Sequence, residues 1–253
     1  MKQSFQILLC VIRHILFNNI PKANDITRTI AKKAYQYITS KKTCQEIYDY
    51  IDSKTGGLGY REKRIGKDWE RVVTLGCYIA WADITNSDSH ILEIGTGLGR
   101  TLYCMQYNSP KEIVTLEIDP FILAIALYSN PYQPFQEALW KPNTHILLGD
   151  AVLLALILKS RKYRFNHIVH DGGPNPEKNP RLYNRFFLSL LYDLLVNNGT
   201  ISVFAGRNPH YVSRIYNLLK RIGFVNVYVV SPPGINVKIV RGVKPGKVDT
   251  ERV

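Results

Sequence analysis

The sequence has few cysteines and no closely spaced pair among them. There are four in 253 residues, far apart and without a C-x-x-C motif: Cys10, Cys44, Cys77 and Cys104. This spacing lacks the ligand pattern of a zinc site and gives no disulfide framework. We therefore expect reduced thiols in the core of an intracellular, cytoplasmic protein that holds no metal.

The sequence also lacks a long uninterrupted apolar run. The best candidate, Ile7 to Ile20, is broken by Arg13 and His14, and no small-residue cleavage site follows it. A membrane-spanning helix needs about 20 apolar residues, and a signal peptide ends at such a cleavage site. We expect a packed amphipathic helix here and no membrane partner. Internal repeats and low-complexity tracts are also missing.

Acidic residues are scarce. Lys and Arg number 33 against 20 Asp and Glu, which gives a formal net charge of +13 and a pI of about 9.5. Such a surplus suits a polyanionic partner such as RNA, although the same charges could serve only to solvate the surface. Residues 1–66 carry twelve basic against five acidic residues, a net of +7 and about half of the surplus.

Residues 1–66 are predicted to form a basic helical N-terminal extension of three short helices. Thr43 and Glu46 form a capping box, and apolar residues recur at helical spacing after a cap at Asn24 or Asp25: Ile26, Ile30, Ala34 and Ile38. The basic run from Lys54 to Lys67 is interrupted by Gly56, Gly57 and Gly59. This extension either grips RNA or forms a solvated cap over a cofactor.

A glycine-rich turn between two apolar strands is the most informative stretch. The strand His90 to Ile94 leads into Gly95, Gly97 and Gly99, where a helix begins. Glycines let a ligand approach the backbone, and a helix N-terminus offers unpaired N–H groups. The next strand, Ile113 to Ile118, delivers Glu117 eighteen positions beyond Gly99. A Rossmann-like unit places a ribose-binding carboxylate at this offset.

The third glycine of a G-x-G-x-x-G dinucleotide fingerprint is missing, because Arg100 stands in its place. The pattern is E-x-G-x-G-x-G and starts at Glu93. Nicotinamide and flavin cofactors are therefore disfavoured. A turn that serves only tight strand-to-helix packing is the alternative explanation.

Alternating strands and helices fill the rest of the chain. Helices are expected at 68–84, 121–128, 182–196 and 211–222, and a proline-bearing loop at 130–135. Further strands are expected at 144–150, 165–170, 199–205, 224–230 and 237–240. This pattern predicts an α/β fold with a doubly covered, Rossmann-like sheet of seven strands over residues 67–243. Residues 244–253 are expected to form a basic flexible tail.

Asp171 is the predicted site of the chemistry. Open parallel sheets bind ligands outside the carboxyl ends of their strands, and Asp171 follows the fourth strand in the motif HDGGP. Its carboxylate could accept an N–H hydrogen bond from a target amine and orient the lone pair. His170 either assists or only supports the strand end. The polar loop from Asn175 to Asn184 is predicted to be a substrate lid.

These motifs together resemble those of the class I S-adenosylmethionine (SAM) methyltransferases. The resemblance implies the seven-stranded sheet of that class with SAM as the cofactor. Gly95, Gly97 and Gly99 would then hold the methionine portion and Glu117 the ribose, and Glu93 would belong to the same cofactor site. By position, Asp150 would meet the adenine amino group, although it could instead simply cap the following helix. A helix like that at 68–84 covers the cofactor edge in this class, which would bring Asp68, Trp69 and Glu70 near the site.

Two groups within the class are similar to residues 68–243. The segments GLGRT, EIDP, SNPYQP, GDA, HD and LYNRFF look like a group of archaeal methyltransferases related to the spermidine synthase lineage, whose fourth-strand motif is usually HDPPR. The segments KNPRLYNRFF, GTISVFAG and PPGINVKIVRG are similar to the methyltransferase that completes methylaminomethyl-uridine at the tRNA wobble position. That second family has Trp in place of Tyr183 and a D-A-F-S-P site in place of HDGGP. Neither resemblance fixes a substrate.

We therefore expect a SAM-dependent methyltransferase that acts on a nitrogen of RNA, with tRNA as the leading candidate and a homodimer as one assembly to test. The main rival is an aminopropyltransferase that uses decarboxylated SAM to extend a polyamine. The basic surplus and the missing D-x-x-D-P site argue against it. A non-catalytic binding protein with the same fold is the third hypothesis, and the retained acids Glu93, Glu117 and Asp150 argue against that.

Overall fold

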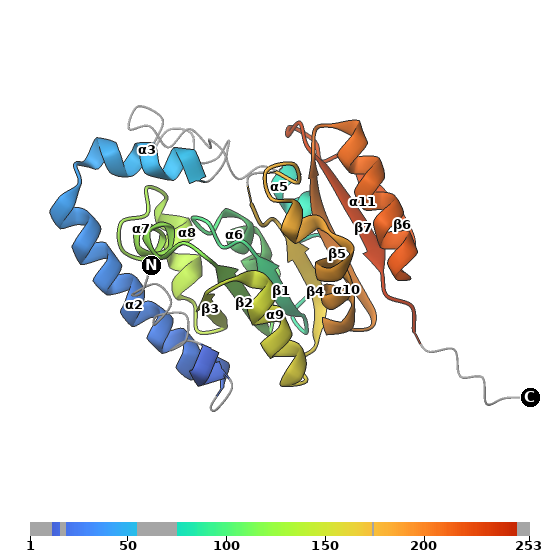
Figure 1. Ribbon diagram of the computed structural model, residues 1–253, viewed down its shortest axis with the longest axis horizontal. Helices are drawn as coiled ribbons and strands as arrows, with labels where there is room; N and C mark the ends of the chain where they lie inside the picture. Colours follow the sequence, from blue (N-terminus) through green and yellow to red (C-terminus); the bar gives the residue numbers. More distant parts are fainter. Residues whose placement is uncertain (1–11, 16–18, 55–74, 174, 247–253) are drawn as a thin grey trace, which may run out of the picture.

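The computed structural model describes residues 12–15, 19–54, 75–173 and 175–246. Its centre is one sheet of seven strands in the order β3-β2-β1-β4-β5-β7-β6 (Figure 1). The strands are β1 (His90–Ile94), β2 (Glu112–Glu117), β3 (Thr144–Leu148), β4 (Phe165–His170), β5 (Leu195–Gly206), β6 (Val225–Val230) and β7 (Lys238–Val243). The expected seven-stranded Rossmann-like sheet is confirmed.

The sheet is not parallel throughout. The pairs β1–β2, β1–β4, β2–β3 and β4–β5 are parallel, but β7 runs antiparallel to both β5 and β6. Strands β6 and β7 are joined by a short connection from Ser231 to Val237, which is compatible only with an antiparallel pair. The sheet is therefore mixed, with β7 running against both of its neighbours.

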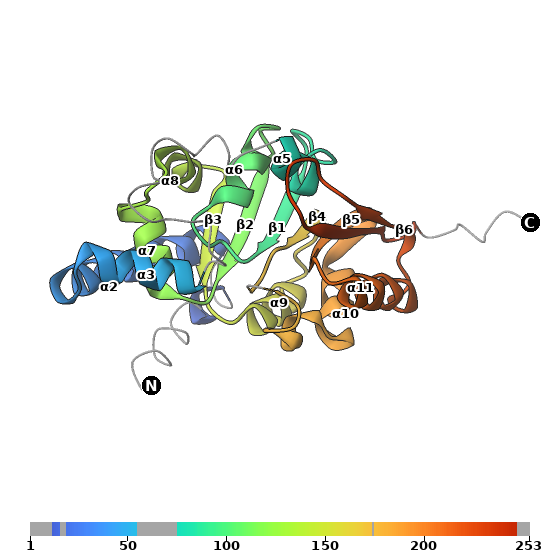
Figure 2. The same ribbon diagram turned by 90° about the horizontal axis from the view of Figure 1, so that it is seen from above.

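Helices cover both faces of the sheet. They are α2 (Ile20–Lys41), α3 (Cys44–Lys54), α5 (Leu75–Trp81), α6 (Arg100–Gln106), α7 (Pro120–Tyr128), α8 (Gln133–Trp140), α9 (Ala151–Ser160), α10 (Arg185–Leu194) and α11 (Pro209–Ile222). Figure 2 shows α5, α6 and α8 on one side of the sheet and α9, α10 and α11 on the other. No helix within the described ranges is both long enough and apolar enough to cross a membrane.

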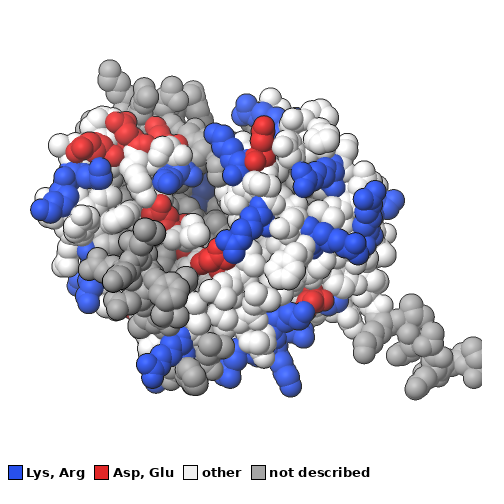
Figure 3. Space-filling model, viewed as in Figure 1, with Lys and Arg blue, Asp and Glu red and all other residues white. Residues whose placement is uncertain are grey.

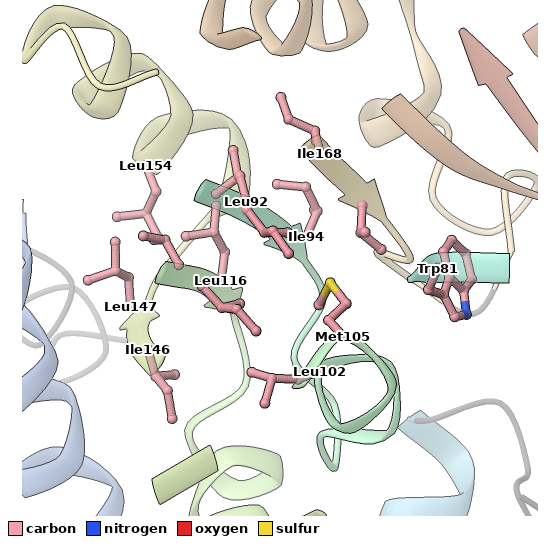
Figure 4. Close-up of a cluster of buried hydrophobic side chains, with 14 of the residues drawn as sticks. Trp81, Leu92, Ile94, Leu102, Met105, Leu116, Ile146, Leu147, Leu154 and Ile168 are labelled. Carbon is pink, nitrogen blue, oxygen red and sulfur yellow. The ribbon is translucent and has the colours of Figure 1, made fainter. Parts of the chain in front are cut away.

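The core lies between these layers. Leu92 and Ile94 of β1, Leu116 of β2 and Ile168 of β4 are buried, with Leu154 of α9 on one side of these strands and Leu102 and Met105 of α6 on the other (Figure 4). The central strands are buried along nearly their whole length because both faces of the sheet are covered. This packing holds the ends of β1, β2 and β4 in a fixed register, with Ile94 paired to both Leu116 and His170.

The N-terminal helix α2 covers the β3 edge of the sheet. Ile146 N of β3 donates to Asn24 Oδ1 at 2.9 Å, and Leu148 N donates to Thr27 Oγ1 at 3.2 Å. These side chains satisfy backbone N–H groups that an edge strand would leave open. The opposite edge is β6, whose Val225, Tyr228 and Val229 are exposed.

The structure corrects the predicted N-terminal helices. One of them is not short, because α2 runs for 22 residues from Ile20. Its N-cap is Asn19, whose side chain accepts from Lys22 N, so the predicted cap at Asn24 or Asp25 is wrong. The capping box before α3 is confirmed: Thr43 N donates to Glu46 Oε2 at 2.8 Å, and Glu46 N to Thr43 Oγ1 at 3.3 Å.

Three further predictions need adjustment. The predicted loop at 130–135 contains the start of α8, because Pro134 stands in the first turn of that helix, where a missing N–H costs nothing. The predicted helix at 182–196 is split into a 3-10 turn η1 (Pro180–Tyr183) and α10, and its last two residues belong to β5. Cys44 is exposed, whereas Cys77 and Cys104 are buried thiols as expected.

Several predicted features lie outside the described residues. These are Cys10, most of the apolar run at 7–20, the glycines and most of the basic run at 54–67, the start of the helix predicted at 68–84, and most of the tail at 244–253. The boundaries at 66 and 243 stay predictions.

Candidate functional site

A pocket of about 1030 Å³ opens at the carboxyl ends of the strands. Its wall contains residues that directly follow five strands: 95–98 after β1, 118–119 after β2, 149–151 after β3, 171–173 after β4 and 207–208 after β5. Figure 3 shows this face hollowed near its middle, with blue side chains beside the opening. Ligand sites usually measure roughly 300–1,000 Å³, so this pocket is at the upper end of that range.

The glycine turn forms the floor of the pocket. Gly95, Gly97 and Gly99 all have positive φ, at 96°, 52° and 91°, which favours glycine over other residues. A Cβ on Gly95 would lie 2.8 Å from the carbonyl O of Asp171, so the turn also needs glycine for close packing. A Cβ on Gly97 would meet nothing within 4 Å, because this residue faces the open pocket. Gly99 caps α6 behind the pocket and packs against Leu139.

Glu117 braces the glycine turn from the end of β2. Its Oε2 accepts from Gly97 N at 2.9 Å, and its Oε1 accepts from Ile118 N and Asp119 N, both at 2.9 Å. Burial raises the pKa of this carboxyl to about 7, although the three N–H bonds act in the opposite direction. Oε2 keeps one lone pair for a ligand hydroxyl, and Glu117 lines the pocket.

Glu93 lies beneath the turn and does not line the pocket. It is fully buried, and its Oε2 accepts from Thr115 Oγ1 at 2.6 Å. Its Oε1 has no hydrogen-bond partner in the part of the chain that the structure describes. Burial raises the pKa of Glu93 well above its usual range, and the nearby charges of Asp171 and Glu117 add to this. Because Thr115 Oγ1 also lies 2.6 Å from Thr96 Oγ1, Glu93 supports the glycine turn from below through Thr115.

Asp150 lines the pocket and also caps α9. Its Oδ1 accepts from Val152 N and Leu153 N, so the predicted capping role is confirmed. Arg181, from η1, reaches across and bonds both carboxylate oxygens, at 2.7 Å and 3.1 Å. A ligand amino group at Asp150 would therefore share this carboxylate with the Arg181 guanidinium.

Asp171 stands between the glycine turn and the far end of the pocket. Its backbone N donates to Ile94 O at 3.0 Å, which fixes the backbone of Asp171 beside the end of β1. Thr101 Oγ1 donates to Asp171 Oδ2 at 3.1 Å. Burial raises the pKa of this carboxyl to about 6, while the charge of Arg100 and the Thr101 bond oppose the rise. At neutral pH the group is mainly ionised and can accept a hydrogen bond.

His170 is fully buried and does not line the pocket. Its Nε2 lies 2.8 Å from Leu182 O, Gly172 N donates to its Nδ1 at 3.4 Å, and its ring packs 4.4 Å from that of Tyr183. Burial lowers the pKa of the imidazole to about 4, so it is neutral at pH 7. These contacts hold the loop after Asp171 against the end of β4. They favour the role of supporting the strand end over that of assisting the chemistry.

The sequence analysis missed several pocket residues. Arg181 lies in the predicted lid, six residues of which line the pocket: Asn175, Pro176, Glu177, Asn179, Arg181 and Leu182. Tyr50 of α3 donates to Asp119 Oδ2 at 2.6 Å and brings Lys54 to the pocket. The four-residue spacing of Tyr50 and Lys54 placed both on one helix face, but no sequence signal said which element that face meets.

The far end of the pocket is lined by aromatic and amide side chains. Trp81 of α5, Phe204 of β5 and Tyr211 of α11 contribute rings, and Asn208 and Asn236 contribute amides. Helix α5 touches the loop before β7 so closely that a Cβ on Gly76 would overlap Pro233 O. Asp68, Trp69 and Glu70, predicted to approach the site, lie outside the described residues.

Comparisons with known proteins place this chain by fold. No protein-family model matches it. An uncharacterized protein of Methanocaldococcus jannaschii is 25% identical over 142 residues, which are 49% of this chain and only 39% of that protein.

Solved structures with a similar fold include a methyltransferase-like protein and spermidine synthases. Human methyltransferase-like protein 13, in complex with SAH, is 16% identical with a TM-score of 0.51 over 72% of this chain and 80% of that one. Spermidine synthase from Thermotoga maritima is 18% identical with a TM-score of 0.49 over 68% of this chain and 58% of that one. A spermidine synthase in complex with the transition-state analogue AdoDATO is 18% identical with a TM-score of 0.48 over 68% and 57%. The likeness to the human protein shows a shared Rossmann-like α/β fold.

Proposed function

We propose that the protein is a SAM-dependent methyltransferase that transfers a methyl group to a nitrogen atom of RNA, with tRNA as the favoured substrate. One observation carries the proposal. Glu117, the glycine turn and Asp171 lie along one pocket, so a ribose-binding carboxylate and an amine-orienting carboxylate flank the place where backbone is most open to a ligand.

The residues present fit SAM. Gly97 offers open space above the turn, and Glu117 keeps a lone pair for a ribose hydroxyl. Ile118 is 66% exposed on the pocket wall, where an apolar side chain would be covered by the face of a planar ring. When bound, SAM supplies an electrophilic methyl group and a neutral thioether leaving group.

Asp171 would position the acceptor. Its Oδ2 accepts from Thr101, which orients the carboxylate so that Oδ1 can accept an N–H from an incoming amine. That bond would aim the nitrogen lone pair at the methyl group, and the proton released after transfer would leave through the same carboxylate or water. Most of the rate acceleration expected of this arrangement comes from positioning.

The far end of the pocket favours an aromatic acceptor. The half-buried rings of Phe204 and Tyr211 could stack on a nucleobase, and the amides of Asn208 and Asn236 could pair with its polar edge. Trp81 is only 2% exposed and would support this wall from behind. A base drawn out of an RNA strand needs this combination of stacking surface and hydrogen-bonding groups. The net charge of +13 suits the phosphate backbone attached to it.

The pocket gives less support to an aminopropyltransferase. Among the described residues its wall has five carboxylates, Glu117, Asp119, Asp150, Asp171 and Glu177, and four cations, Lys54, Arg100, Arg181 and Arg207. A polyamine carries several positive charges and would favour a pocket with a larger acidic surplus. The near balance of charge favours an uncharged acceptor group.

The first experiment titrates the protein with SAM and, separately, with decarboxylated SAM in a calorimeter. We expect SAM to bind and Glu117→Ala to abolish binding without unfolding the protein. Glu112→Ala, at the other end of β2 and outside the pocket, is the matched control and should bind normally. A preference for decarboxylated SAM would support the polyamine reaction instead.

The second experiment follows labelled methyl groups from SAM into tRNA. Asp171→Ala should keep SAM affinity near normal but suppress transfer. Undiminished transfer by this variant would remove Asp171 from the chemistry. If SAM binds but no RNA, protein or small amine is methylated, the non-catalytic hypothesis would be favoured.

A further inference from the structure

One long stretch near the C-terminus lacks acidic residues. From Leu194 to Gly246 it contains no Asp or Glu but seven Lys or Arg: Arg207, Arg214, Lys220, Arg221, Lys238, Arg241 and Lys244. This segment builds β5, α11, β6 and β7, and so also one wall of the far end of the pocket.

Three of these cations are already bonded to other groups of the chain. Arg241 is buried and bonds Asp83, Lys244 Nζ donates to the carbonyls of Tyr192 and Leu195, and Lys238 Nζ donates to Ser231. The other four are exposed, and all lie on α11 or directly before it. The exposed positive charge of this segment is therefore concentrated on one helix.

The exposed side of α11 forms a straight line of polar side chains. His210, Arg214, Asn217 and Arg221 are spaced three or four residues apart, so they share one face of the helix, and all are exposed. The buried residues Ile215 and Leu219 lie on the opposite face, against the sheet. From His210 to Arg221 this ridge is about 16 Å long, at about 1.5 Å of rise per residue.

The ridge begins at the pocket. Arg207, Asn208 and Tyr211, at the start of α11, line the far end of the pocket. Figure 3 shows blue side chains over the right-hand half of this face, where α11 and β6 lie in Figure 1. A chain whose end enters the pocket would leave it along the ridge.

Helix stability does not explain this arrangement. Lys220 and Arg221 stand in the last turn of α11, where cations interact favourably with the helix dipole. Arg214 is in the middle of the helix and Arg207 precedes it, where a positive charge gains nothing from the dipole. The cations are therefore arranged along α11 in a row that leads away from the pocket. The phosphate backbone of an RNA whose base enters the pocket would take the same path.

We propose that the ridge Arg207, His210, Arg214, Asn217 and Arg221 binds the phosphate backbone of the RNA whose base enters the pocket. This inference rests on the proposed function, which it deepens by giving the path of the substrate. It makes α11, and not the basic extension of residues 1–66, the main RNA contact. Helix α2 of that extension lies at the opposite end of the molecule from α11 (Figure 1).

The test measures binding of a fluorescein-labelled, unmodified tRNA transcript by the full chain at several salt concentrations. The variant Arg214→Gln with Arg221→Gln should bind roughly tenfold more weakly, and the slope of log affinity against log salt should fall by about two, because two phosphate contacts are lost. Both residues are outside the pocket, so SAM affinity in calorimetry and kcat at saturating RNA should be unchanged while KM for RNA rises.

The matched control is Lys32→Gln with Lys33→Gln, two exposed adjacent cations on α2. We expect its RNA affinity and salt slope to equal those of the wild type. The inference is wrong if this control loses RNA binding and the α11 variant does not, or if polyglutamate competes as well as tRNA. If the wild type binds no RNA, the path and the RNA part of the proposed function both fall, while SAM titration still reports on the cofactor.

Discussion

Asp171 is surrounded by groups that set its charge. Burial raises the pKa of its carboxyl to about 6, and Arg100 and Thr101 oppose that rise. If the ionised form accepts the amine N–H, methyl transfer at saturating SAM should increase with pH, with a midpoint near pH 6 and a plateau above about pH 7. His170 adds no second step near neutrality, because burial lowers the pKa of its ring to about 4.

Arg100→Gln should shift this acid limb to higher pH, since it removes the charge that favours the carboxylate. Thr101→Val should shift it in the same direction by removing the bond to Oδ2. Lys33→Gln, which removes an exposed cation of α2 outside the pocket, serves as the control and should leave the midpoint in place. A midpoint that is the same in all four proteins would show that Asp171 does not control the profile.

Glu117 links stability to pH. The pKa of its carboxyl is about 7 in the folded protein and close to 4.5 when unfolded. Between about pH 4.5 and 7, the folded state therefore keeps a proton on Glu117 that the unfolded state has lost. The contribution of Glu117 to the free energy of unfolding falls as the pH rises through this range. Glu117→Gln removes this titration, so its stability relative to the wild type should rise by about 3 kcal/mol between pH 4.5 and 8. Urea unfolding at both pH values measures this, and a constant difference would contradict it.

At the scale of elements, Arg241 joins β7 to α5. Its guanidinium is buried and bonds both oxygens of Asp83, the carbonyls of Ile79 and Ala80, and Ser202 Oγ. Helix α5 supplies Trp81 to the pocket, so this one side chain holds part of the pocket wall onto the sheet.

Arg241→Met should cost about 3 kcal/mol of unfolding free energy, because it leaves the Asp83 carboxylate and two carbonyls without their partner. Lys238→Met, on the same strand but bonded only to the exposed Ser231, should cost much less. Urea denaturation compares the two. Equal losses of unfolding free energy would show that the buried hydrogen bonds of Arg241 add no more stability than the exposed bond of Lys238.

Helix α2 contributes through hydrogen bonds as well as packing. Asn24→Ala and Thr27→Val would each leave a buried N–H of β3 without an acceptor, which should cost about 1–3 kcal/mol. Thr29→Val is the control, since its hydroxyl donates only to Asp25 O on the exposed side of the helix. Unfolding free energies that are alike for Thr27→Val and Thr29→Val would show that the edge contact adds nothing.

At the scale of the whole molecule, the sequence predicted what depends on local pattern. The strand ends, the glycine turn, Glu117 and Asp171 were recognisable because apolar runs and special residues adjoin each other in the chain. The packing of α2 was not, because Asn24 and Thr27 bond to residues more than 120 positions away. The same holds for Arg181 and Tyr50, whose partners Asp150 and Asp119 are brought to them only by the fold.

Glu93 and His170 show a different limit. Both stand beside pocket residues in the sequence, and both turn inward to bond Thr115 and Leu182. A strand alternates its side chains between two faces, but at a strand end the turn geometry decides which residue faces the ligand. Their assigned roles in cofactor binding and catalysis stay predictions, and their contacts favour support of the residues that do face the pocket.

The two edges of the sheet are unequal, and this limits how copies of the molecule can join. An assembly that grows by adding sheets side by side needs two free edges in every copy, one for each neighbour. Within the described residues, α2 occupies the β3 edge and only β6 is open. Edge-to-edge association through β6 would therefore end at two copies, and a fibre could form only if α2 first left the sheet.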